Sequence, residues 1–161
     1  MHRSGRLAEA RSAYAIILRA DASNTDALNG LGAIACQTGE YEEAIRILEP
    51  LTRSNPALAA AQNNLGEALR LSGRLAEAEP RYAAAIAAEV DRAEYYNNYG
   101  ELLRALGRFD EAGVALAVQR DEQFLLRNEQ IGTVNLHQVI AGLHFDARVI
   151  HEQPLDVAFD P

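Results

Sequence analysis

One short phrase recurs four times in this chain at a constant spacing of 34 residues. Each copy starts with a glycine, continues with a charged and then a hydrophobic residue, and closes on Glu-Ala; the four glycines are Gly5, Gly39, Gly73 and Gly107. A second series keeps the same step, as Leu31-Gly32, Leu65-Gly66 and Tyr99-Gly100. Self-similarity at this period is the signature of a helix–turn–helix solenoid. The repeat therefore predicts an all-α chain of stacked helix pairs.

Composition narrows the class of protein further. The net charge of −8 argues against a nucleic-acid partner and disfavours anionic membranes, since both need a basic face. Cys36 is the only cysteine, which excludes an internal disulfide and favours a reducing compartment. No stretch approaches the roughly 18 apolar residues of a membrane span, and the first residues lack the apolar core of a signal peptide. We predict a soluble cytoplasmic protein.

Apolar periodicity and helix-ending residues divide the repeats into helix pairs. Asn24 offers an N-cap for the first full pair, and Gly39 supplies the left-handed residue that closes its first helix. Pro56, which follows Asn55, marks the end of the second helix of that pair. The expected helices cover 5–20, 25–38, 41–53, 60–72, 76–88, 94–106 and 110–120.

Side-chain size at equivalent positions predicts how the two helices of a pair pack. Small residues recur on both helices, as Gly32 and Gly66 on first helices and Ala44 and Ala78 on second helices. They allow the axes to approach to roughly 8 Å. Larger residues then fill the surrounding space; they are Leu31, Leu65 and Tyr99 on one side and Tyr14, Leu48, Tyr82 and Leu116 on the other.

This arrangement resembles the tetratricopeptide repeat family. The resemblance covers residues 1–124, with a half repeat at 1–24 and repeats at about 25–58, 59–92 and 93–126. It implies a right-handed α-solenoid whose first helices line a concave groove that binds a peptide or a partner protein. We expect a degenerate repeat or capping helices over 125–151 and a tail over 152–161.

The sequence departs from the family pattern in a few places. The large aromatic residue that usually opens the first helix is replaced by Leu28 and Gln62, and only the third repeat keeps one, as Tyr96. Two prolines, Pro50 and Pro80, fall inside second helices, where each removes a hydrogen bond and should bend or weaken the helix.

The first helix has no preceding helix with which to form a pair. Its apolar residues, including Leu7, Tyr14 and Leu18, are expected to remain uncovered, whereas terminal repeats normally carry a polar cap. Either the chain continues in a longer protein, or another subunit or segment covers this face. A homo-oligomer formed through the first helix is one such possibility.

Asparagines mark the strongest candidate site. Asn29, Asn63 and Asn97 share one repeat position, and Asn64 and Asn98 share the next. Asparagine is unfavourable inside a helix because its side chain competes for backbone hydrogen bonds. By resemblance, Asn64 and Asn98 match an asparagine ladder that grips peptide main chain in some tetratricopeptide domains. The alternative is that these asparagines bond neighbouring helices and stabilise the stack.

Two charged pairs lie one turn further along the same helices. Glu67 with Arg70, and Glu101 with Arg104, are i,i+3 pairs that either flank the groove and select charged partner side chains or serve as ordinary surface pairs. The chain contains no lysine, so it lacks the Lys and Arg combination with which some relatives clamp a C-terminal carboxylate.

The sequence offers little support for a metal site, a phosphate-binding site or a catalytic nucleophile. His137, His144 and His151 recur every seven residues, which would put neighbours about 10.5 Å apart along a helix, too far to share one metal ion. No phosphate-binding loop and no nucleophile motif occurs, and Cys36 is interpreted as a packing residue. We therefore predict no catalytic residue, no metal and no cofactor.

These patterns favour a non-catalytic scaffold that binds a protein or peptide in the groove. Two alternatives remain open. The chain could be the targeting arm of a larger enzyme of the glycosyltransferase or methyltransferase type, or a scaffold that assembles with itself.

Overall fold

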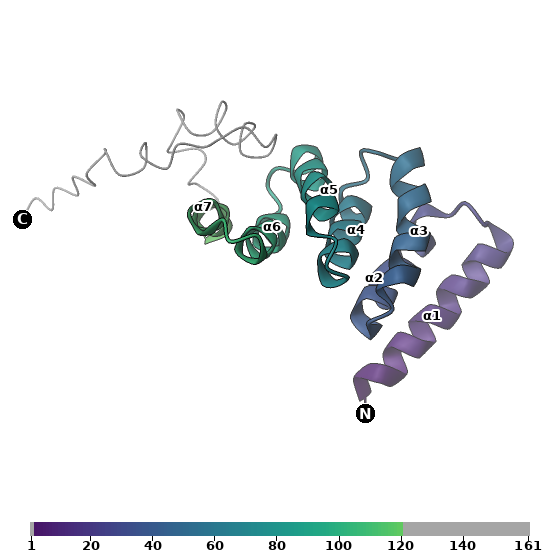
Figure 1. The fold of residues 1–161 in the computed structure, drawn as a ribbon. Coiled ribbons are helices and arrows are strands. Elements are labelled where there is room, and N and C mark those ends of the chain that lie inside the picture. The colour runs from purple at the N-terminus through teal and green to yellow at the C-terminus, as the bar shows by residue number, and fades with distance from the viewer. Residues whose placement is uncertain (1, 121–161) are drawn as a thin grey trace, which may run out of the picture.

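The computed structural model describes residues 2–120, and within this range the fold is entirely helical. Figure 1 shows the helices following one another in a row, from α1 at one end to α7 at the other. The elements are α1 (His2–Ala20), α2 (Thr25–Thr38), α3 (Tyr41–Ser54), α4 (Ala59–Leu71), α5 (Leu75–Ala88), α6 (Ala93–Ala105) and α7 (Phe109–Arg120). Helices α2 and α3, α4 and α5, and α6 and α7 pack as pairs, and each pair also contacts the next.

The predicted turns are confirmed. Gly39, Gly73 and Gly107 adopt φ values of 81°, 85° and 76°, a left-handed conformation that glycine reaches without steric cost. At the start of α2, the Asn24 side chain accepts a hydrogen bond from the Ala27 amide at 3.0 Å, as expected of an N-cap. Helix ends agree with the sequence-based boundaries within one or two residues, except at α1.

Helix α1 begins at His2, three residues before the expected start at Gly5. In the later repeats a first helix must end just before the equivalent glycine, so the chain has to turn there. No described helix precedes α1, and Gly5 therefore lies inside a continuous helix rather than at a turn.

Large side chains of second helices fill the space that glycines of first helices leave. A methyl group at Gly32 would lie 2.5 Å from Cγ of Leu48, and one at Gly66 would lie 3.0 Å from Cε1 of Tyr82. Leu48 and Tyr82 are fully buried, as is Ala78 on the same helix as Tyr82. The predicted small-to-large packing is therefore present in the α2–α3 and α4–α5 pairs.

Two departures from the repeat pattern are accommodated locally. Helices α3 and α5 continue through Pro50 and Pro80, both of which are exposed. Gln62 is buried in α4, and its Nε2 donates to the carbonyl oxygen of Pro56 at 3.0 Å. A polar residue at this core position is thus partly satisfied by the connection that precedes its own helix.

Ion pairs join consecutive repeats at one equivalent position, with reversed polarity. Arg11 of α1 bonds Glu40 in the α2–α3 turn at 2.7 Å, and 68 residues later Glu79 of α5 bonds Arg108 in the α6–α7 turn. Both pairs span 29 residues. Between them, the position equivalent to Arg11 and Glu79 is the buried Ile45, so Arg74 pairs instead with Glu77 and approaches Glu49.

The degenerate repeat expected over 125–151, the tail over 152–161 and the three histidines lie outside the described residues. None of the helices within 2–120 has the length and apolar character required to cross a membrane.

Candidate functional site

Side-chain hydrogen bonds join the asparagines of successive first helices. Nδ2 of Asn64 on α4 donates to Oδ1 of Asn29 on α2 at 2.9 Å. Nδ2 of Asn98 on α6 donates to Oδ1 of Asn63 on α4 at 3.0 Å. The two bonds have the same direction and the same separation of 35 residues. We call the surface that carries these four residues and Asn97 the amide face.

The members of the amide face differ in exposure. Asn63 is buried, with 4% of its surface exposed, whereas Asn29, Asn64, Asn97 and Asn98 are half-buried. Asn97 makes no corresponding bond within the described residues, and the residue 35 positions later in the sequence is Gly132, which has no side-chain amide. Asn29, Asn64 and Asn98 thus bond a neighbouring asparagine and still keep accessible surface, whereas Asn63 bonds its neighbour from a buried position.

The first full repeat lacks the second asparagine because α1 occupies its place. Gly30 stands where the later repeats have Asn64 and Asn98. A methyl group at Gly30 would lie 2.4 Å from Cζ of Tyr14, closer than side-chain carbons approach in proteins. The ring of Tyr14 thus covers the α2 end of the amide face, and with the ring in this position only glycine fits beneath it.

The charged pair on α4 is held by a third residue. Arg70 donates two hydrogen bonds to the Glu67 carboxylate, at 3.0 and 2.9 Å, and the Tyr82 hydroxyl donates to the same carboxylate at 2.7 Å. The bond to Glu67 raises the pKa of Arg70, and burial together with the Glu67 charge raises the pKa of Tyr82. Tyr82 was predicted from its repeat position as a packing residue, and its hydroxyl makes it a member of this cluster as well.

The equivalent pair on α6 is looser. Arg104 donates one hydrogen bond to Glu101 at 3.1 Å, and the side chains are 52% and 43% exposed, against 23% for Arg70 and 28% for Glu67. The sequence has Leu116 at the position of Tyr82, and a leucine offers no hydroxyl. The two pairs predicted together therefore differ: one is fixed and half-buried, and the other is open to solvent.

Cys36 lies beside the amide face as a packing residue. Its Sγ donates to the backbone carbonyl of Asn64 at 3.6 Å. Burial, with the nearby Glu67 charge, raises the pKa of the Cys36 thiol to about 11. Such a thiol stays protonated at neutral pH and is a poor nucleophile.

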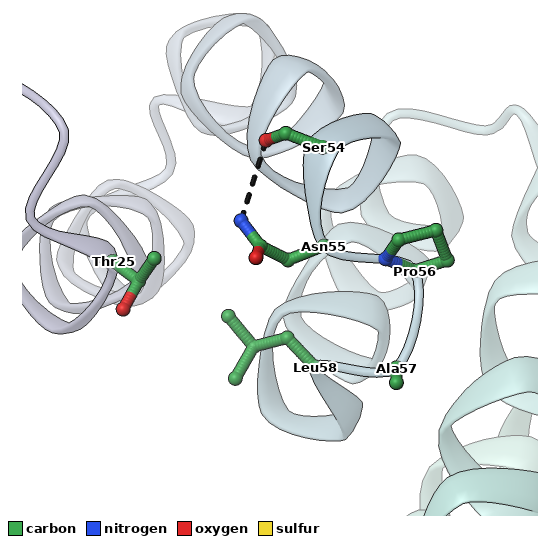
Figure 2. A pocket seen from close by; sticks show the side chains of 6 residues that line it. All are labelled: Thr25, Ser54, Asn55, Pro56, Ala57 and Leu58. Carbon is green, nitrogen blue, oxygen red and sulfur yellow. Dashed lines mark hydrogen bonds between the residues drawn. The ribbon is translucent and has the colours of Figure 1, made fainter.

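A shallow hollow lies apart from these residues, where the N-terminal end of α2 meets the connection between α3 and α4 (Figure 2). Its volume is about 420 Å³, and it is lined by Thr25, Ser54, Asn55, Pro56, Ala57 and Leu58. The Asn55 amide donates to Ser54 Oγ at 3.3 Å, and Ser54 Oγ in turn donates to the Pro50 carbonyl at 2.9 Å. These polar groups are already engaged with each other, and the hollow contains none of the predicted site residues.

Comparison with solved structures supports the architecture. One crystal structure of MamA superimposes with a TM-score of 0.64 at 24% identity, covering 88% of this chain and 86% of that one. A structure of MamA AMB-1 gives a TM-score of 0.62 at 20% identity, covering 73% and 70% of the two chains. At these identities the likeness concerns the fold.

Sequence comparison gives the family. Over 90 residues the chain is 39% identical to the cellulose synthase operon protein C of Komagataeibacter xylinus, a match that covers 48% of this chain and 7% of that protein. The tetratricopeptide repeat pattern matches residues 1–68, 59–84 and 72–122. With helix pairs of the same period and a solenoid fold, this chain belongs to the tetratricopeptide repeat family.

Proposed function

We propose that this protein is a non-catalytic scaffold that holds an extended segment of a partner protein on the amide face. The observation that carries the proposal is that Asn64 and Asn98 occupy one repeat position on adjacent first helices. Each donates a hydrogen bond to an asparagine of the preceding repeat. A carboxamide has two N–H donors and an acceptor oxygen, and each of these side chains uses one N–H for the inter-helix bond. One donor and one acceptor then remain on each for a partner main chain.

The experiment compares binding and stability in a single variant. A partner is first captured with the wild-type protein and identified by mass spectrometry, and its affinity is measured by calorimetry. Asn64→Ala with Asn98→Ala is expected to weaken binding at least tenfold, because partner amides are left unpaired at about 1–3 kcal/mol each. Asn55→Ala, an exposed asparagine in the hollow of Figure 2, is the control and should bind normally.

Stability is the second measurement. The double variant also loses two inter-helix hydrogen bonds, worth about 0.5–1.5 kcal/mol each, and gains part of this back because alanine is the better helix former. A modest fall in melting temperature is therefore expected in either case. A fall in stability with unchanged affinity would retire the binding role and leave the asparagines as bonds of the stack.

Self-assembly through α1 is a second candidate function. Ile16 and Ile17, adjacent on α1, are 64% and 41% exposed, and neighbouring apolar side chains left in water favour association. A second copy of the chain is the proposed occupant. Light scattering should show a concentration-dependent dimer that Ile16→Glu with Ile17→Glu abolishes; a wild-type protein that stays monomeric at every concentration contradicts this candidate.

A role as one arm of a larger enzyme is the third candidate. The relative from Komagataeibacter xylinus is far longer than the matching stretch, so arrays of this kind do occur within larger proteins. Sequencing of the complete reading frame tests this candidate, and a frame without a catalytic domain rejects it.

A further inference from the structure

The two asparagine bonds divide the amide face into residues that accept and residues that donate. In each bond the acceptor is the first asparagine of one repeat, Asn29 or Asn63, and the donor is the second asparagine of the next repeat, Asn64 or Asn98. Both bonds span 35 residues in the sequence, and in both the later repeat donates to the earlier one. This polarity is not needed for stability alone, because an amide pair can bond equally well in either direction.

In the bond between Asn98 and Asn63, the acceptor is also more deeply buried than the donor. Asn63 is 4% exposed and has little surface with which to touch a partner, whereas its donor Asn98 is half-buried and accessible. A free carboxamide rotates about its last torsion, which is broad. The bond from Nδ2 fixes that rotation and leaves the acceptor oxygen and one N–H of the donor asparagine in a fixed direction.

We propose that Asn29 and Asn63 are positioning residues that orient the carboxamides of Asn64 and Asn98 for main-chain recognition. This inference rests on the proposed function above and adds a division of roles to it. The acceptor of each bond, Asn29 or Asn63, fixes the orientation of the neighbouring carboxamide. The donor, Asn64 or Asn98, contacts the partner main chain. Orientation before binding reduces the entropy lost when the partner is bound.

The spacing of the two oriented amides defines the partner segment. They lie on neighbouring helices, α4 and α6, and helices in contact have axes about 8–10 Å apart. A segment in the extended polyproline II conformation advances about 3.1 Å per residue and repeats its direction every three residues. The two amides therefore match the N–H and C=O groups of residues n and n+3 of a peptide in this conformation. Its side chains are not specified by these contacts, but proline is excluded at both positions because it lacks an N–H.

The nearby Glu67 carboxylate bonds other groups than these amides. The Glu67 carboxylate accepts from Arg70 and Tyr82, so its hydrogen-bonding capacity is largely used within its own repeat. Asn55 provides the control, because it is an exposed asparagine that lies outside the amide face.

A double-mutant cycle on binding tests the assignment. The probe is a dodecapeptide selected from a random displayed library on the wild-type protein, and its Kd is measured by calorimetry. Asn29→Ala with Asn63→Ala should weaken binding about fivefold or more. The same changes should have no further effect in a protein that already carries Asn64→Ala and Asn98→Ala, because the groups they position are absent. Asn55→Ala should leave the Kd unchanged, because Asn55 lies outside the amide face, and Asn29→Asp, which keeps the acceptor oxygen, should restore binding relative to Asn29→Ala.

Each alternative has its own result. Additive losses in the cycle would show that Asn29 and Asn63 contact the peptide themselves, and an unchanged Kd in Asn29→Ala with Asn63→Ala would limit them to stabilising the stack; either result overturns the inference but leaves the scaffold function standing. Normal binding by Asn64→Ala with Asn98→Ala would reject the proposed function itself. N-methylation of the peptide at two residues three apart should abolish binding, whereas failure to find such a pair, or a library that yields no binder, overturns main-chain recognition.

Discussion

Helices α1 and α5 carry the same phrase but differ in how they are packed. Tyr82 of α5 is fully buried against Gly66 of its own repeat, whereas the equivalent Tyr14 of α1 is half-buried and reaches forward to Gly30 of the following repeat. Among residues 6–20 of α1, no side chain is buried. The repeat phrase therefore specifies a helix with one apolar face, and the neighbouring first helix determines whether that face becomes core.

Removal of the two equivalent tyrosines should give the largest difference in stability between α1 and α5. Tyr82→Ala should destabilise the fold by about 3–5 kcal/mol, because it leaves a large cavity against Gly66 and removes the hydroxyl bound to Glu67. Tyr14→Ala should cost much less, since part of that ring already faces solvent. Urea denaturation of both variants gives the comparison, and equal losses would mean that α1 is as firmly packed as α5.

Overpacking tests the same contrast at the helix crossing. Ala78→Leu should destabilise by about 1–3 kcal/mol, because Ala78 is fully buried and the added atoms force α4 and α5 apart. Ala10→Leu, at the equivalent position of half-buried α1, should be close to neutral. A melting temperature that Ala78→Leu does not change would place Ala78 away from the crossing.

Placing an asparagine at Gly30, the position of Asn64 and Asn98 in later repeats, tests whether Tyr14 of α1 occupies that space. Gly30→Asn should cost less than Ala78→Leu, since the atoms it meets are the far end of the Tyr14 ring, which can swing outward. The cost should disappear in the Tyr14→Ala background. Thermal melting of the two single variants and the double variant measures this coupling, and additive effects would show that Tyr14 does not occupy the position.

The ion pair between α1 and the next repeat should give the smallest effect. Arg11→Glu places two carboxylates together and should lower the melting temperature slightly, and Glu40→Arg in the same protein should restore it with reversed polarity. Because nearly half of each side chain is exposed to solvent, the difference should shrink as salt is raised from about 0.05 to about 1 M NaCl. A salt-independent difference would point to packing rather than charge.

Much of the fold followed from the sequence because its cues are local and repeated. The turns at Gly39, Gly73 and Gly107 depend on backbone conformation, and the contacts of Gly32 and Gly66 depend on size at a fixed spacing. The start of α1 was predicted three residues too late, because the phrase marks a turn in three repeats but no turn in α1, which no described helix precedes.

The candidate site was harder to predict in detail. The repeat register identified Asn29, Asn63, Asn64, Asn97 and Asn98 as a set, but not which amide bonds which, since that depends on the stagger between neighbouring first helices. The hydrogen bond from Tyr82 to Glu67 could not be predicted either. Leu48 and Leu116 occupy the position of Tyr82 in the other repeats and suggest a purely apolar role for it.

The reversed polarity of the ion pairs between repeats limits how this array can be shortened or rearranged. Deleting residues 25–58 would keep the period and the helix pattern, yet it would bring Arg74 into the place of Glu40, opposite Arg11, so that two guanidinium groups faced each other. Deleting 59–92 instead would put Arg108 in the place of Arg74, opposite the apolar Ile45 as before, but without its partner Glu79. The repeats are therefore similar in shape without being interchangeable, because the charged residues at their junctions pair only when the repeats follow in this order.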